Sequence, residues 1–165
     1  MKKTLLSVLI ITILVQIFIP VYMIWGKYDV LKNGEEVKIR IAPVDPYDAF
    51  RGRYVSLWYE YDLDYNQRHG KYGILGIDGD GFATVKEVRR EQPKGELYLT
   101  SKDEYYFDIP IDRYYMEETL APQTEKMLSG EKEAYVTVRI KGDKSVISGL
   151  YIDGKPVEEI LEKQS

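Results

Sequence analysis

An uncharged, apolar segment at the N-terminus constrains this chain more than any other feature. After two lysines, no charged residue occurs from Thr4 to Trp25. A helix of about 22 residues is roughly 33 Å long, which is enough to cross the hydrocarbon core of a bilayer. The sequence therefore predicts a membrane anchor in residues 1–27, in contact with the lipid bilayer through residues 4–25, and one separate domain in residues 28–165.

A cleaved signal peptide is the main alternative for this segment. Signal peptides carry a shorter apolar region of roughly 7–15 residues and a small-residue cleavage site. Here the run is longer, and its last residues, 21–26, contain no Ala-x-Ala pair. Tyr22 and Trp25 are typical of the aromatic belt at a membrane interface. A lipoprotein signal would need a cysteine, and the chain has none. These observations favour a retained signal anchor.

Basic residues predict the orientation of the anchor. Lys2 and Lys3 precede the apolar run, whereas Lys27 and Lys32 follow it together with several acidic residues. Positive charge accumulates on the cytoplasmic side of membrane proteins. We therefore expect a single-pass protein with its N-terminus inside and its C-terminal domain outside the cytoplasm, in the periplasm or at the exterior.

The charge of the domain limits its partners. The whole chain carries a net charge of −4, and the part after the two N-terminal lysines carries −6. This balance argues against nucleic acid as a partner and against general electrostatic docking on anionic lipid. We expect the bilayer itself and another membrane protein as partners.

Alternation of apolar and polar residues dominates the domain and predicts strands. Fifteen tyrosines also suit half-buried β surfaces. Strands are predicted at residues 36–41, 54–63, 72–77, 82–88, 96–99, 105–109, 134–140 and 146–152. Short helical segments are predicted at residues 119–128 and 157–163. The predicted fold is mainly β: an N-terminal transmembrane helix followed by one antiparallel β-rich domain with one or two short helices.

Neither a metal nor another cofactor is predicted. The sequence Asp78-Gly79-Asp80-Gly81 resembles the start of a calcium loop, but position 12 of such a loop would be Arg89 instead of glutamate. We interpret it as a hairpin turn. The single histidine, His69, lies in a polar segment, and zinc normally requires several His or Cys ligands.

The segment from Pro43 to Tyr59 carries the most functional information. Its two prolines exclude a helix and favour a turn that leads into a strand. It presents the candidate binding residues Asp45, Asp48, Arg51, Arg53, Tyr54 and Trp58. The structural alternative is a loop whose aspartates and arginines pair with one another. Trp58 lies on the polar face of the predicted strand, so we expect it to be solvent-accessible unless another element covers it.

A second candidate group follows further along the chain. Arg113 could pair with Glu117 or Glu118 on the surface, which is the usual outcome in a charged chain. Alternatively, Arg113 and Glu117 could complete a charged cleft with residues of the proline-containing segment. We include both residues in the predicted binding surface.

These segments resemble a family of membrane-anchored bacterial proteins named for a Gly-Asp-Tyr-x-x-Leu-x-Tyr signature that follows a Pro-x-Asp-Pro loop. The matching residues are Pro43, Asp45, Pro46, Gly52, Tyr54, Leu57 and Tyr59. Arg53 replaces the aspartate of the signature. Residues 111–118 and 146–154 resemble the family's later motifs. The resemblance implies a location in the bacterial cytoplasmic membrane, and it implies no activity.

Three functional hypotheses follow. The first is a non-enzymatic extracytoplasmic domain that binds or scaffolds another membrane protein, because the sequence shows no cluster of nucleophile and base. The second is a membrane-surface enzyme that uses a carboxylate pair drawn from Asp45 or Asp48 and Glu117 or Glu118. The third is a degenerate signal-peptidase-like β domain, for which Ser56 lies inside a predicted strand instead of before it.

Overall fold

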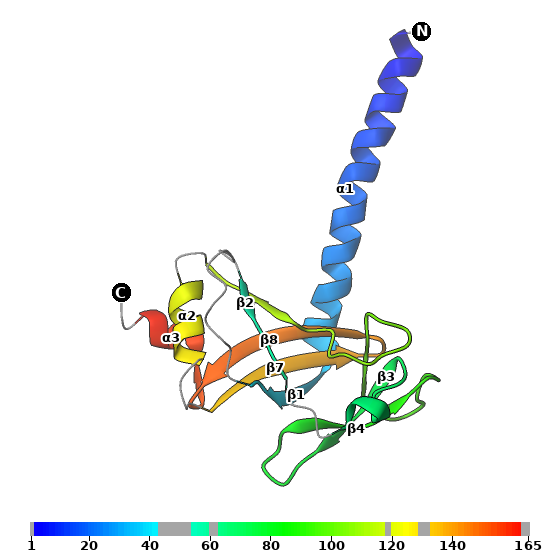
Figure 1. Ribbon diagram of the computed structural model, residues 1–165. Helices are drawn as coiled ribbons and strands as arrows, with labels where there is room; N and C mark the ends of the chain where they lie inside the picture. The colour runs from blue at the N-terminus through cyan, green and yellow to red at the C-terminus, as the bar shows by residue number, and fades with distance from the viewer. Residues whose placement is uncertain (1, 43–53, 60–62, 118–119, 129–132, 163–165) are drawn as a thin grey trace.

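One long helix rises from a β-rich domain (Figure 1). The computed structural model describes residues 2–42, 54–59, 63–117, 120–128 and 133–162. Every strand pair in this part of the chain is antiparallel. The predicted fold class, an apolar N-terminal helix followed by a mainly β domain with short helices, is confirmed.

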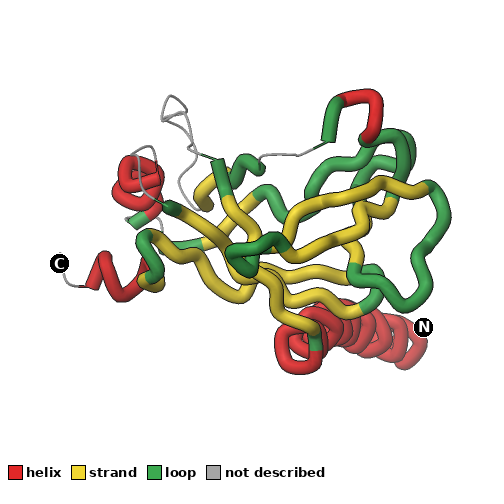
Figure 2. Tube along the Cα trace, turned by 90° about the horizontal axis from the view of Figure 1, so that it is seen from below, coloured by secondary structure: helices red, strands yellow, loops and turns green. Residues whose placement is uncertain are grey.

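The strands form three sheets, with orders β1-β7-β8-β9, β2-β6 and β4-β3-β5. The strands are β1 (Glu35–Arg40), β2 (Tyr54–Ser56), β3 (Tyr72–Ile77), β4 (Ala83–Arg89), β5 (Tyr98–Thr100), β6 (Arg113–Tyr115), β7 (Ala134–Lys141), β8 (Lys144–Ile152) and β9 (Lys155–Pro156). The helices are α1 (Lys2–Asn33), α2 (Ala121–Leu128), α3 (Val157–Glu162) and the 3-10 turn η1 (Tyr65–Gln67). Figure 1 shows that α1 projects away from the strands and meets them only at its C-terminal end, and in Figure 2 α2 and α3 lie at the end of the domain that carries the C-terminus.

Helix α1 is long and apolar enough to span a membrane. An 18-residue window within its span from Leu6 to Asn33 has a mean hydropathy of 2.4 and is 0% buried within the protein. These features are compatible with a single-pass protein, and a signal sequence shares them. The helix continues without a break through Tyr28 to Asn33, beyond the predicted anchor of residues 1–27.

The last turns of α1 belong to the packed domain. Val30 is only 1% exposed. Its carbonyl oxygen accepts a hydrogen bond of 2.8 Å from the backbone N–H of Gly34. Asp29 accepts hydrogen bonds of 2.9 and 2.7 Å from the Nζ atom of Lys141, at the end of β7. The helix is therefore fixed to the sheet without a flexible linker.

The core follows the predicted alternation most clearly in β7. Val136, Val138 and Ile140 are buried on one face, as the period-2 pattern predicted. A second packing point lies under β3, where Phe107 is 0% exposed and its ring occupies the space beside Gly73.

Two strand predictions need correction. The predicted strand from Tyr54 to Leu63 is shorter, because strand geometry ends at Ser56, although Trp58 still forms an isolated bridge with Ala42. The segment from Tyr105 to Ile109 is not a strand. Asp103 accepts hydrogen bonds from the backbone N–H groups of Tyr105 and Tyr106, and this local turn competes with strand pairing.

The predicted hairpin turn between β3 and β4 is confirmed. Asp78 Oδ1 accepts hydrogen bonds of 2.9 Å from the backbone N–H of Asp80 and 2.8 Å from that of Phe82. Arg40 of β1 pairs with Asp78 and Asp80, so the charges of this loop are balanced by an arginine. The hydrogen bond from Phe82, and then that from Arg40, hold the pKa of Asp78 below its ordinary value.

We expect Asp78→Asn to lower the melting temperature at pH 7 and to flatten its dependence on pH. Because the pKa of Asp78 is lower in the folded than in the unfolded state, the ionised carboxylate stabilises the folded state. This stabilisation is complete above the pKa of the unfolded state, about 3.9. It is lost as the pH falls through the pKa of the folded state. Thermal unfolding followed by circular dichroism between about pH 2 and 7 measures how the melting temperature depends on pH. Asp143→Asn, in the exposed β7–β8 turn, is the control. Parallel curves for the wild type and Asp78→Asn would contradict the prediction.

Candidate functional site

The pairing of β2 with β6 brings together two candidate segments that are about sixty residues apart. In its register, Tyr54 lies opposite Tyr115 and Ser56 lies opposite Arg113. Figure 1 shows β2 and the yellow-green β6 above β7 and β8, on the side from which α1 rises. The signature-like strand and the later arginine-aromatic segment therefore form one surface.

An arginine and two tyrosines form the centre of this surface. The guanidinium carbon of Arg113 lies 4.7 Å from the centroid of the Tyr54 ring. The Tyr54 and Tyr115 rings are 5.8 Å apart and tilted by 60°. A side-chain hydrogen bond with Tyr115, followed by the interaction with Tyr54, raises the pKa of Arg113 above its ordinary value, so this side chain remains charged. Tyr115 is 69% exposed, which leaves one ring of the group open to a partner.

A pocket of about 340 Å³ lies beside Arg113. It is lined by Ser56, Leu57, Trp58, Tyr59, Arg68, Asp108, Ile109, Asp112 and Arg113. Trp58 is 62% exposed, so the expectation that its ring is solvent-accessible is confirmed. Val55, on the opposite face of β2, is 0% exposed and holds the strand against the core.

Backbone and ionic contacts hold the walls of the pocket in place. The backbone N–H of Leu57 donates a hydrogen bond of 2.9 Å to the carbonyl of Asp112. The carboxylate of Asp112 accepts a hydrogen bond of 2.8 Å from Lys102. Partial burial acts to raise the pKa of Asp112, but the hydrogen bond and charge of Lys102, with a smaller contribution from Arg113, outweigh it, so the pKa lies below its ordinary value.

Charges and rings together indicate what this arrangement can do. Arg68 and Arg113 contribute two positive charges to the lining, and Asp108 and Asp112 contribute two negative charges. Such a pocket suits hydrogen bonding and stacking with a polar group of a partner better than attraction of a single strong charge.

The predicted site residues divide into two groups. Tyr54, Trp58 and Arg113 come together on this surface. Glu117 lies apart from the pocket lining, at the turn before α2, where its carbonyl accepts hydrogen bonds from Leu120 and Ala121. The ion pair that the structure gives for Arg113 is with Asp112, at 3.8 Å. The remaining candidates lie outside the described residues: Asp45, Asp48, Arg51, Arg53 and Glu118. The carboxylate-pair hypothesis therefore stays a prediction.

Sequence reasoning missed several residues of the site. Tyr115, Arg68, Asp108 and Asp112 were not among the candidates. Asp112 and Tyr115 fall within residues 111–118, which resemble a family motif, but the run Arg113-Tyr114-Tyr115 is too short to show a period. Tyr114 takes part in a different contact, since its hydroxyl donates a hydrogen bond to Glu158 of α3. Burial and then Glu158 raise the pKa of Tyr114 well above its ordinary value.

Within the residues that the structure describes, no group of three or more His, Cys, Asp or Glu side chains is placed to hold a metal ion. His69 forms an isolated bridge with Tyr106, and its ring lies edge-on to Tyr65 at 6.2 Å between centroids.

Comparison with known proteins gave a match to a protein family. Neither the curated proteins nor the solved structures gave a significant match. The sequence does match the family described as GDYXXLXY protein over residues 16–150, which include the C-terminal part of the apolar run, β2 and β6. Because the match covers well over half of the chain, this protein belongs to the GDYXXLXY family.

Proposed function

We propose that this protein is a membrane-anchored, extracytoplasmic binding or scaffold domain that acts with another membrane protein. The observation that carries the proposal is the group formed by Tyr54, Arg113 and Tyr115 across β2 and β6 together with Trp58 just after β2, which we call the signature surface. On this proposal the protein has no catalytic role of its own.

The residue types of the signature surface support a binding role. Trp, Tyr and Arg contribute a large share of the binding energy at protein interfaces. Trp58 and Tyr115 are 62% and 69% exposed, so a large aromatic area is open, while Val55 of β2 is 0% exposed on the opposite face. Rings held by a packed strand lose little conformational entropy when a partner binds.

The position of the signature surface supports a partner in the membrane. Lys27 of α1 lines one pocket of about 480 Å³ together with Arg113, Tyr114 and Tyr115 of β6. Lys27 follows the end of the apolar run by only two residues. With α1 in a bilayer, β6 would therefore lie at the membrane surface, within reach of the extracytoplasmic part of a second membrane protein.

Photo-crosslinking in intact cells tests the proposal. With a photoreactive phenylalanine analogue in place of Tyr115, we expect one abundant adduct with an integral membrane protein, identified by mass spectrometry. Tyr105, which is 83% exposed in a different segment, is the matched control position and should not give this adduct. Adducts with soluble proteins alone, or equal adducts at both positions, would refute the proposed role of the signature surface.

Trp58→Ala should weaken binding to the partner that the crosslink identifies by at least about tenfold, which corresponds to about 1.4 kcal/mol. Because Trp58 is largely exposed, the free energy of unfolding should change by less than about 1 kcal/mol. Binding measured in detergent and urea unfolding check the two parts. Loss of folding in Trp58→Ala would show that this ring supports the core instead of a partner.

A further inference from the structure

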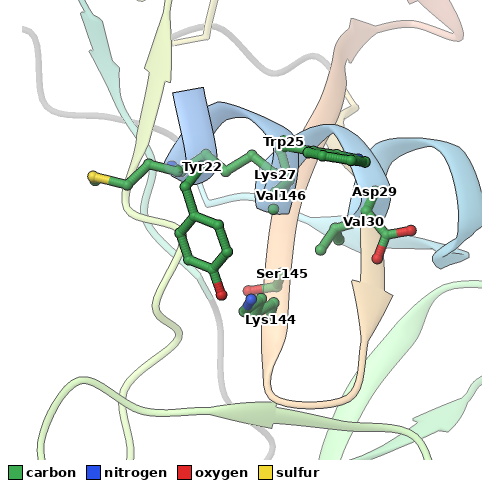
Figure 3. Close-up of a pocket in the computed structure, with 10 residues that line it drawn as sticks. Tyr22, Trp25, Lys27, Asp29, Val30, Lys144, Ser145 and Val146 are labelled. Atoms are coloured by element: carbon green, nitrogen blue, oxygen red, sulfur yellow. The ribbon is translucent and has the colours of Figure 1, made fainter. Parts of the chain in front are cut away.

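A second, larger pocket lies between the lower part of α1 and the start of β8. We call it the α1–β8 pocket; its volume is about 640 Å³. Most of its wall is apolar and comes from Tyr22, Met23, Trp25, Val30 and Val146. Figure 3 shows the Tyr22 ring extending from α1 toward the end of β8 that carries Lys144 and Ser145.

When α1 spans a bilayer, the position of the pocket along the helix determines which part of the bilayer surrounds the pocket. Tyr22 and Trp25 occupy the end of the apolar run, where aromatic side chains mark the boundary between hydrocarbon and head groups. Lys27 lies one half-turn further along the helix. The pocket therefore opens at the level of the phospholipid head groups, and lipid is the molecule present there at the highest concentration.

Two lysines give the pocket a positive charge. Asp29, the only acidic residue of the lining, is engaged by Lys141 at 2.7 Å. Among the described residues, neither Lys27 nor Lys144 forms an ion pair, although the charge of Lys144 also acts on Asp29. The Nζ atom of Lys144 lies against α1, 3.7 Å from the point that a Cβ atom at Gly26 would occupy. The pocket thus combines an apolar wall with two available ammonium groups.

We propose that the α1–β8 pocket binds the head group of an anionic phospholipid. The lysine ammonium groups hold the phosphate, and the glycerol and first acyl carbons pack against Tyr22, Trp25 and Val146. The pocket favours an anionic over a zwitterionic lipid because its one carboxylate is already paired and offers no counter-charge to a choline or ethanolamine amine. The negative net charge of the domain does not oppose such a site, since charges further away than about 8 Å are screened at physiological salt.

This inference requires α1 to remain on the protein, but it does not depend on a protein partner. The test uses the purified full chain in detergent micelles. Native mass spectrometry records lipid retention during titration with dimyristoyl phosphatidylglycerol or dimyristoyl phosphatidylcholine. We expect one phosphatidylglycerol to be retained with at least fivefold higher occupancy than phosphatidylcholine. Lys27→Gln and Lys144→Gln should each weaken phosphatidylglycerol binding about fivefold, as expected for a lysine near anionic head groups.

Lys94→Gln is the matched control, since it makes the same change at an exposed lysine between β4 and β5. It should leave retention unchanged, and Lys144→Arg should preserve it. Equal retention of the two lipids by the wild type, or unchanged retention in both Lys27→Gln and Lys144→Gln, would overturn the proposal. A failed crosslink at Tyr115 would leave this result unaffected, so the two proposals can fail separately.

Discussion

Phe107→Ala is expected to lower the free energy of unfolding of the β domain by about 3–5 kcal/mol. The ring is 0% exposed, and removing it leaves a cavity that the surrounding strands can close only in part. Urea unfolding of the full chain in detergent, followed by circular dichroism in the β region, measures the loss. A change below about 1 kcal/mol would show that Phe107 is not the packing centre that the structure describes.

Gly73 provides a sharper test of the same contact. A Cβ atom at residue 73 would overlap the ring of Phe107, so Gly73→Ala alone should cost about 1–3 kcal/mol. In the Phe107→Ala background the same methyl group enters the vacated space, and the cost should fall or change sign. Gly79→Ala, where nothing lies within 4 Å of the added atom, is the control. Additive effects of Gly73→Ala and Phe107→Ala would contradict the contact.

Val30→Asp is expected to separate α1 from the sheet. Val30 is 1% exposed, so the new carboxylate would be buried without a partner in an apolar contact. We expect a loss of about 3 kcal/mol or more in the stability of this contact, in the range of the most damaging single substitutions. Hydrogen exchange of amides in β7 and β8, measured on the full chain in detergent, should increase together with a lower unfolding midpoint.

Two further variants define the cause of this effect. Leu31→Asp introduces the same charge at the neighbouring residue, which is 37% exposed, and should cost less than about 1 kcal/mol. Val30→Ala removes two methyl groups without adding charge and should cost roughly 2 kcal/mol. If Val30→Asp and Leu31→Asp had equal effects, the end of α1 would not be packed into the domain as the structure describes.

Features that depend on short stretches of chain were predictable from the sequence. The apolar run forms α1 because its length and composition need no distant partner to make a helix. The alternation in β7 and the turn chemistry of Asp78–Gly81 act within a few residues. The turn at Asp153 and Gly154 is equally local, with φ angles of 51° and 76°. The exposure of Trp58 agrees with the predicted alternation, although β2 itself ends at Ser56.

The candidate site was predictable only in part. Tyr54, Trp58 and Arg113 were selected by residue type, and the structure places them on one surface. Their association depends on the pairing of two three-residue strands, β2 and β6, which are too short to carry a periodic signal. Tyr115 joins the surface through the same pairing, and no local pattern distinguishes it from the other tyrosines of the chain.

The sequence by itself determined the apolar helix, the mainly β class and the positions of the tight turns, because hydrophobic period and turn chemistry act over a few residues. Only the tertiary structure decided that the end of α1 packs against the domain through Val30, that β6 pairs with β2, and that Lys144 lies against α1. These contacts join residues that are distant in the chain. Their stability depends on the packing of the whole domain, which no local pattern encodes.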